Sequence, residues 1–242
     1  MDKRDWIWLT LFSIAMAFLE SAVVVYLREI YYPNGFQFPL VPIESKLAVT
    51  ELIREFATLV MLLGIGILVG KTKIERFAYF IYSFAVWDIF YYVFLKCLLN
   101  WPDSIFTWDV LFLIPITWVG PVIAPIITSI TMIILAIVMV KKANQVKNFR
   151  LKFFEIFMLI LGSLVTIFSF IQDYFGFLIT NYKFSEWNYL NNNSIFGKSA
   201  NYIPSDFNWW IFLLAELILA IPIVSIYRGL ANSINSFQRN SK

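Results

Sequence analysis

Hydrophobic residues gather in six long stretches along this chain, separated by segments that carry charge, proline or asparagine. Five of these stretches have the length of one membrane-spanning helix, which needs about 20 predominantly apolar residues: 6–27, 47–70, 76–96, 153–179 and 208–228. With the remaining stretch, the pattern predicts an all-helical, polytopic membrane bundle of six transmembrane helices. Little chain is left outside the spans, so residues 1–242 are interpreted as a single integral membrane domain.

The fourth stretch, residues 109–140, is too long for one simple span. As a continuous helix it would measure about 48 Å at ~1.5 Å per residue, against a hydrocarbon core of about 30 Å. Pro115, Gly120, Pro121 and Pro125 lie in or just past its first half, where they would break a helix. We therefore expect a short interfacial or re-entrant segment near 106–116, followed by a span at about 118–140.

Lysine and arginine are distributed unevenly between the two sets of loops, and this distribution predicts the orientation. If the N-terminus is cytoplasmic, the inner segments hold thirteen basic residues: Lys3, Arg4, Lys71, Lys73, Arg76, Lys141, Lys142, Lys147, Arg150, Lys152, Arg228, Arg239 and Lys242. The outer segments hold five: Arg28, Lys46, Lys96, Lys183 and Lys198. We therefore expect both termini on the cytoplasmic side of a multi-pass protein of the plasma or inner membrane.

The composition supports a membrane protein and excludes several kinds of chemistry. Hydrophobic residues make up 60% of the chain and charged residues 14%, against roughly 45–50% and 25% in soluble domains. The chain has no histidine, which removes bis-histidine haem sites, HExxH zinc sites and every imidazole base. Cys97 is its single cysteine. We expect no cofactor apart from a cation held by carboxylates, and the absence of a basic stripe argues against nucleic acid as a partner.

Acidic residues inside apolar spans are the feature most indicative of function, because each costs about 2.5–3.5 kcal/mol on insertion scales at the helix centre. Four of them occupy similar positions within their predicted spans: Glu20, Glu55, Asp88 and Glu216. At ~1.5 Å per residue, all four are expected about 10–12 Å below the outer boundary. A common depth predicts a polar pocket in the outer half of the bundle.

The second span begins with three charged residues, Glu51, Arg54 and Glu55. Their spacing of i, i+3 and i+4 places them on one helical face. We expect this face to point into the bundle, with Arg54 as the partner of one or two carboxylates. Later in the same span, Gly66 and Gly70 form a small-xxx-small pair that would allow another helix to approach closely.

The third span adds Asp88, which shares a helical face with Tyr91 and Tyr92. Their hydroxyl groups are candidates to donate hydrogen bonds to the Asp88 carboxylate. Asp109 is expected to be shallower, as an interfacial residue or a helix N-cap. Glu51 is likewise the member of its cluster closest to the interface.

Three classes of function fit such a pocket. A small transporter or channel could use the carboxylates to handle a cation, a proton or a basic solute. A non-catalytic subunit of a larger membrane assembly, or of a homo-oligomer, could use buried charges to fix helix register or to meet charges on a partner. An enzyme acting on lipid or quinone could use a carboxylate pair as acid and base.

An ordinary structural explanation stands beside these three. In it, Arg54 neutralises Glu51 or Glu55, and the other acids reach the interface or stay protonated in hydrogen bonds. The enzyme is the weakest of the functional classes, because the sequence contains no imidazole base, phosphate-binding glycine loop or dinucleotide fingerprint. The proline- and glycine-containing segment 114–121 favours transport, since broken helices expose backbone groups that bind ions or substrates.

Overall fold

The computed structural model describes residues 3–146, 148–182 and 201–240, with the side chains of 231–240 left aside. Within these residues the chain forms six long helices: α1 (Lys3–Tyr31), α2 (Ser45–Val69), α3 (Lys73–Leu99), α4 (Ile123–Gln145), α5 (Phe153–Asn181) and α7 (Trp209–Asn240). Each is long and apolar enough to cross a membrane, in α7 over Trp209–Leu230. The predicted number of apolar helices is therefore confirmed, and it is compatible with an integral membrane protein.

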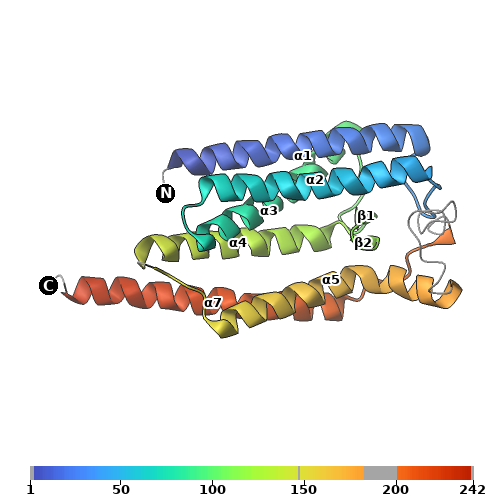
Figure 1. The fold of residues 1–242 in the computed structure, drawn as a ribbon. Helices are drawn as coiled ribbons and strands as arrows, with labels where there is room; N and C mark the ends of the chain where they lie inside the picture. The colour runs from blue at the N-terminus through green and yellow to red at the C-terminus, as the bar shows by residue number, and fades with distance from the viewer. Residues whose placement is uncertain (1–2, 147, 183–200, 241–242) are drawn as a thin grey trace.

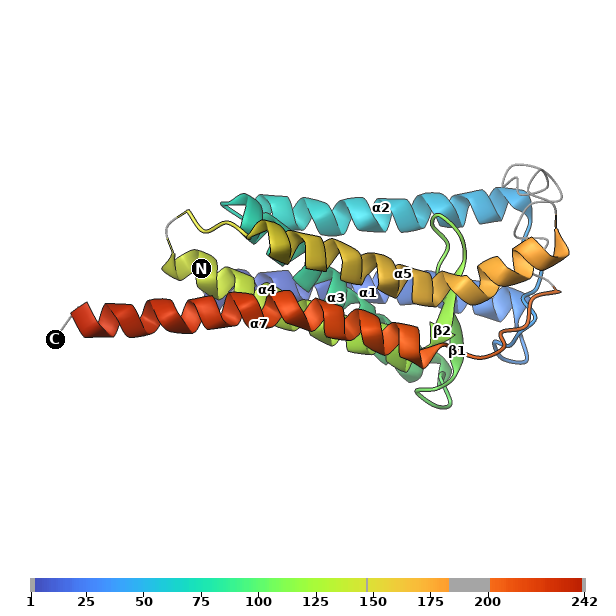
Figure 2. The same ribbon diagram turned by 90° about the horizontal axis from the view of Figure 1, so that it is seen from below.

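The helices lie roughly parallel and form two groups (Figures 1 and 2). In the first group α3 is central and packs against α1, α2 and α4. In the second group α5 packs against α7, and α7 in turn contacts α4. Both described termini lie at one end of the bundle, here called the terminus-bearing end, and the opposite end is called the loop end (Figure 1).

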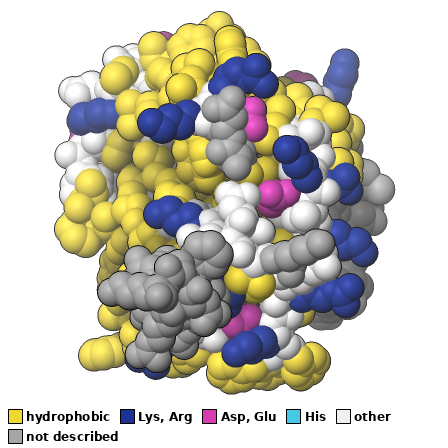
Figure 3. Space-filling view, turned by 90° about the vertical axis from the view of Figure 1, so that its left-hand side faces the viewer, with side chains coloured by type: hydrophobic (Ala, Val, Ile, Leu, Met, Phe, Trp, Pro, Cys, Tyr) yellow, Lys and Arg dark blue, Asp and Glu magenta, His cyan; other side chains and the backbone are white. Residues whose placement is uncertain are grey.

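The terminus-bearing end carries lysine and arginine side chains spread over its surface (Figure 3). This placement agrees with the basic character that the sequence assigns to the cytoplasmic side. Five of the basic residues counted in the sequence have side chains outside the described part of the structure: Lys147, Lys183, Lys198, Arg239 and Lys242. The orientation in a membrane stays a prediction.

A β-hairpin replaces the helical start expected for the fourth span. Strands β1 (Trp108–Phe112) and β2 (Trp118–Pro121) pair antiparallel, with Val110 opposite Val119 and a register shift beside Phe112. Pairing satisfies the backbone groups of a proline-containing segment that cannot continue a helix. The helix therefore begins at Ile123 and not at 118, and whether the hairpin enters the bilayer stays a prediction.

Local sequence signals define the helix ends at the terminus-bearing end. Thr72 caps α3 in a capping box with Glu75, whose carboxylate accepts hydrogen bonds from the backbone N–H groups of Lys71 and Thr72. At the start of α5, Glu155 accepts a hydrogen bond of 2.8 Å from the Lys152 backbone N–H and another of 2.8 Å from the Ser225 hydroxyl of α7. The two carboxylates thereby hold the turn between α2 and α3 and join α5 to α7.

An apolar core fills the half of the bundle nearest the terminus-bearing end. It combines side chains from five helices, among them Leu9 of α1, Tyr79 of α3, Met139 of α4, Leu159 of α5 and Ile226 of α7. Burial of such side chains is the main attraction between helices in this half. The core leaves the polar residues of the spans to be accommodated in the opposite half.

Close packing of α2 on α3 depends on Gly66. A Cβ atom at this position would lie 2.8 Å from both the Arg76 carbonyl oxygen and the Phe80 backbone nitrogen. Gly64, two residues earlier on the same helix, has nothing within 4 Å of the position that a Cβ atom would occupy. The sequence predicts that another helix approaches α2 closely at the glycine pair, and α3 does so at Gly66. The atoms nearest to Gly66 belong to the backbone of α3, which cannot move aside as a side chain could.

We predict that Gly66→Ala destabilises the protein by about 1–3 kcal/mol, because overpacking against helical backbone forces α2 and α3 apart. Gly64→Ala is the matched control, and it should be neutral or slightly stabilising since alanine favours helix more than glycine. The measurement is thermal unfolding of the purified variants in detergent. Equal unfolding temperatures for the two variants would contradict the packing described here.

Candidate functional site

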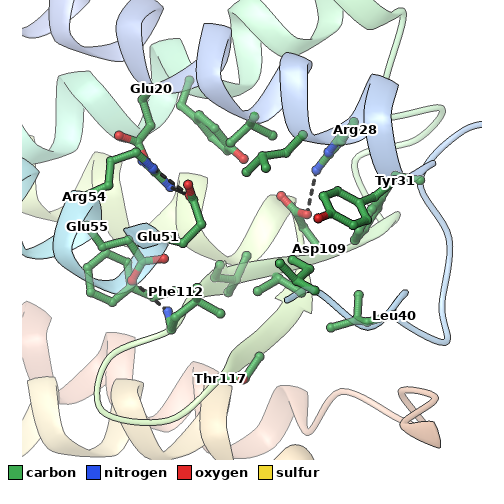
Figure 4. A pocket seen from close by; sticks show the side chains of 18 of the residues that line it. Glu20, Arg28, Tyr31, Leu40, Glu51, Arg54, Glu55, Asp109, Phe112 and Thr117 are labelled. Atoms are coloured by element: carbon green, nitrogen blue, oxygen red, sulfur yellow. Dashed lines mark hydrogen bonds and ion pairs between the residues drawn. The ribbon is translucent and has the colours of Figure 1, made fainter. Parts of the chain in front are cut away.

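A cavity of about 160 Å³ lies in the loop-end half of the bundle, between α1, α2, α3 and the hairpin (Figure 4). Seven of the eight residues predicted from the sequence line it: Glu20, Glu51, Arg54, Glu55, Asp88, Tyr91 and Tyr92. The segment that follows α1 contributes Phe36, Leu40 and Val41 to its wall. This volume accommodates several water molecules or a small organic ion.

Arg54 of α2 links the first two helices by pairing with two carboxylates. Its guanidinium donates to Glu51 at 2.7 Å and to Glu20 of α1. Glu20 accepts a further hydrogen bond of 3.2 Å from the Thr58 hydroxyl, one turn along α2. As predicted, Arg54 is the partner of two carboxylates, and the face of α2 that carries it points into the bundle (Figure 4).

Glu55 turns away from Arg54 and contacts the hairpin instead. Its carboxylate accepts a hydrogen bond of 3.0 Å from the backbone N–H of Leu113, in the turn between β1 and β2. The side chain is buried. Glu55 is therefore a buried acid whose hydrogen-bond partner is a neutral amide, and it attaches the hairpin to α2.

Asp88 of α3 accepts its hydrogen bond from α4. The Ser129 hydroxyl donates to Asp88 Oδ2 at 2.8 Å, and this donor takes the place that the sequence assigns to Tyr91 and Tyr92. Both tyrosines line the cavity, but Tyr92 faces Asp109. The proposed tyrosine donors for Asp88 are therefore wrong, because α4 packs against the face of α3 that carries Asp88.

A second ion pair lines the cavity, formed by Arg28 and Asp109. Arg28 Nη2 lies 2.9 Å from Asp109 Oδ1, and the side chains are 8% and 1% exposed. The guanidinium carbon sits 4.3 Å from the ring centroid of Phe36 and 3.8 Å from that of Trp101. The two rings, whose centroids lie 5.8 Å apart with their planes nearly perpendicular, both supply cation–π attraction to the guanidinium.

Sequence reasoning missed this pair. Arg28 is counted above as an outer-loop residue, but α1 continues to Tyr31 and carries Arg28 into the bundle. Asp109 is expected to be interfacial or a helix N-cap, but it lies on β1 and is buried. In the sequence, the two residues share only the presence of aromatic neighbours. That feature cannot predict a contact between residues 81 positions apart.

Burial raises the pKa of Asp109 above the ordinary value of an aspartate. The Arg28 guanidinium, the Val110 backbone N–H and the Tyr92 hydroxyl act in the opposite direction, because they favour the carboxylate. Asp109 thus depends on Arg28 to keep a charge in surroundings that disfavour it.

Glu216 lies apart from the cavity, contrary to the prediction of one shared pocket. Its carboxylate on α7 accepts hydrogen bonds from Thr128 at 2.8 Å and from Thr131 at 2.6 Å, both on α4. The reason is topological, because α7 belongs to the second helix group and contacts α4 and α5. The depth that Glu216 was predicted to share with Glu20, Glu55 and Asp88 therefore did not place it in their cavity.

The cavity contains more negative than positive groups. Five carboxylates, of Glu20, Glu51, Glu55, Asp88 and Asp109, face two guanidinium groups, of Arg28 and Arg54. Two of the acids, Glu55 and Asp88, have hydrogen bonds from neutral donors and no ion pair. Carboxyl groups therefore outnumber guanidinium groups by three, five against two, in the lining of this cavity.

Within the described residues, no group of three or more aspartate, glutamate or cysteine side chains is placed to hold a metal ion.

Comparison with known protein families, with curated proteins and with solved structures finds no match. The chemistry of the cavity is consequently the basis on which a function can be proposed.

The ion pair yields a prediction about stability. Arg28→Met or Asp109→Leu alone should each destabilise the protein by about 3–5 kcal/mol, since each leaves a buried charge without its partner. The double variant should lose much less than the sum, because neither charge remains. Unfolding by titration with a denaturing detergent measures all three; additive losses would show that the two charges do not depend on one another.

Proposed function

We propose that the protein is a small membrane transporter that receives an organic cation, such as a protonated amine or a quaternary ammonium ion, in the loop-end cavity. It would lie in the plasma or inner membrane with its termini in the cytoplasm and the cavity in the outer half. The observation that carries this proposal is the pair of carboxylates, Glu55 and Asp88, that face the cavity without a cationic partner.

The aromatic wall of the cavity supports an organic cation over an inorganic one. Seven aromatic side chains line it: Tyr31, Tyr32, Phe36, Trp87, Tyr91, Tyr92 and Phe112. Aromatic faces attract alkylammonium groups through their quadrupole and also cover their methyl groups. Within the protein, the Arg28 guanidinium beside this cavity is already in cation–π contact with Phe36 and Trp101.

The apolar core on the cytoplasmic side of the cavity supports a transporter over an open channel. The apolar core around Tyr79 and Met139 fills the half of the bundle nearest the terminus-bearing end. Release on the cytoplasmic side would require the helix groups to move relative to each other. The group of α5 and α7 meets the first group through α4 and β2, a limited contact that suits such a motion.

The alternative of a non-catalytic subunit receives no specific support. It predicts charge left uncovered on a lipid-facing surface, where a partner would neutralise it. In the described spans Glu20, Glu51 and Glu55 are instead buried within the protein. Their pairing with Arg54 and the hairpin is complete without a partner subunit.

The test is equilibrium binding of tetramethylammonium to the purified protein in nanodiscs, followed by uptake of the same ion into proteoliposomes. Glu55→Gln and Asp88→Asn should each weaken binding by about tenfold to a hundredfold, because a charged partner is replaced by a neutral group. Uptake should fall in parallel.

Matched controls are Glu29→Gln and Asp103→Asn, which change exposed acids outside the cavity and should leave binding unchanged. Neopentyl alcohol, a neutral molecule of similar size, should bind much more weakly than tetramethylammonium. If tetramethylammonium does not bind, or if Glu55→Gln and Asp88→Asn bind it like the controls, the proposed function is wrong.

A further inference from the structure

A second, largely apolar cavity of about 250 Å³ lies beside the first, between α3, α4 and α5. Its walls include Phe84 of α3, Met132 and Leu135 of α4, and Leu159 and Ile167 of α5. The hairpin covers it towards the loop end through Leu111, Phe112 and Trp118. Such walls accommodate a hydrocarbon chain and offer little to an ion.

This lateral cavity opens towards the side of the bundle. Neither α3 nor α5 closes it, because α3 packs on α1, α2 and α4, while α5 packs on α7 and β2. Phe77 of α3 and Ser163 of α5 both line the cavity and are exposed. Since both lie within helices of membrane-spanning length, the opening faces the bilayer.

The loop-end cavity and the lateral cavity adjoin one another. Four residues line both of them: Trp87, Asp88, Leu111 and Phe112. On one side of this junction lie the carboxylates and guanidinium groups, and on the other side lie aliphatic and phenyl side chains. A molecule that occupies both cavities would need a polar cationic part and an apolar part, with Asp88 next to the boundary.

The Trp87 side chain at the junction needs a hydrogen-bond acceptor, which an occupant could supply. Its side chain is 6% exposed, and its indole N–H finds no acceptor among the described residues. A buried donor without an acceptor costs about 1–3 kcal/mol. An occupant with an acceptor oxygen between its cationic and apolar parts would satisfy this N–H.

We infer that the substrate is a cationic amphiphile that enters from the bilayer between α3 and α5. Its ammonium group occupies the loop-end cavity at Asp88 and Glu55, an oxygen accepts from the Trp87 indole N–H, and its hydrocarbon tail occupies the lateral cavity. This inference rests on the proposed function, of which it specifies the substrate class. A free hydrophilic amine would use the loop-end cavity alone.

The test compares the acetyl, butanoyl and hexanoyl esters of choline as ligands of the protein in nanodiscs, with empty nanodiscs correcting for partition into lipid. Affinity should rise roughly tenfold for each added pair of methylene groups, as expected when a tail is transferred to an apolar site. Ser163→Phe places a phenyl ring at the opening and should abolish this dependence on tail length. Tetramethylammonium, which has no tail, should bind the variant as it binds the wild type.

Two further variants sharpen the result. Leu164→Phe is the control for bulk, because Leu164 is the exposed neighbour of Ser163 and does not line the cavity; it should keep the dependence on tail length. Trp87→Phe retains a ring but loses the N–H, and should weaken the esters severalfold more than it weakens tetramethylammonium.

The outcomes separate this inference from the proposed function. If tetramethylammonium binds through Glu55 and Asp88 but affinity does not rise with tail length, or Ser163→Phe acts like Leu164→Phe, the amphiphile is overturned and the transporter of small amines stands. If tetramethylammonium does not bind at all, the proposed function fails. Esters that still bind in proportion to tail length would then show an apolar site without a cationic subsite, which also overturns the amphiphile.

Discussion

The ion pair between Arg28 and Asp109 is the interaction on which the loop-end half of the bundle depends. It joins the last turn of α1 to β1 through a contact of 2.9 Å between two buried side chains. A charge in such surroundings is tolerated only with its partner present. The pair therefore fixes the hairpin against α1, and with Glu55 bonded to Leu113 the hairpin is attached to α2 as well.

Once the hairpin is fixed, both cavities follow from its position. It closes the space between α1, α2 and α3 on one side and covers the space between α3, α4 and α5 on the other. A continuous helix through residues 109–140 would leave Asp109 and Leu113 unable to reach Arg28 and Glu55 in this way. The proline residues that prevent the helix are thus responsible for the polar cavity and for its junction with the apolar one.

Hydropathy and helical spacing were sufficient to predict the six apolar helices and the cluster around Arg54. Glu51 and Arg54 are neighbours on one helix, so their pairing follows from local geometry. Arg28 and Asp109 could not be joined in this way, because their contact depends on a hairpin that the strongly apolar sequence did not reveal. Glu216 shows the converse limit: depth along a helix is a local property, whereas the neighbours of α7 are set by the order in which the helices pack.

The remaining carboxylates, Glu55 and Asp88, indicate why the cavity suits an exchangeable occupant. Neutral donors offset part of the cost of a charge in a low-dielectric interior, but less than an ion pair with suitable geometry would. A cation at the cavity would supply the missing charge, and a proton on the carboxylate would remove the need for it. In the proposed transporter these two states exclude one another at the same oxygen atoms, so that binding of the organic cation and protonation of Glu55 or Asp88 would be coupled through a single site.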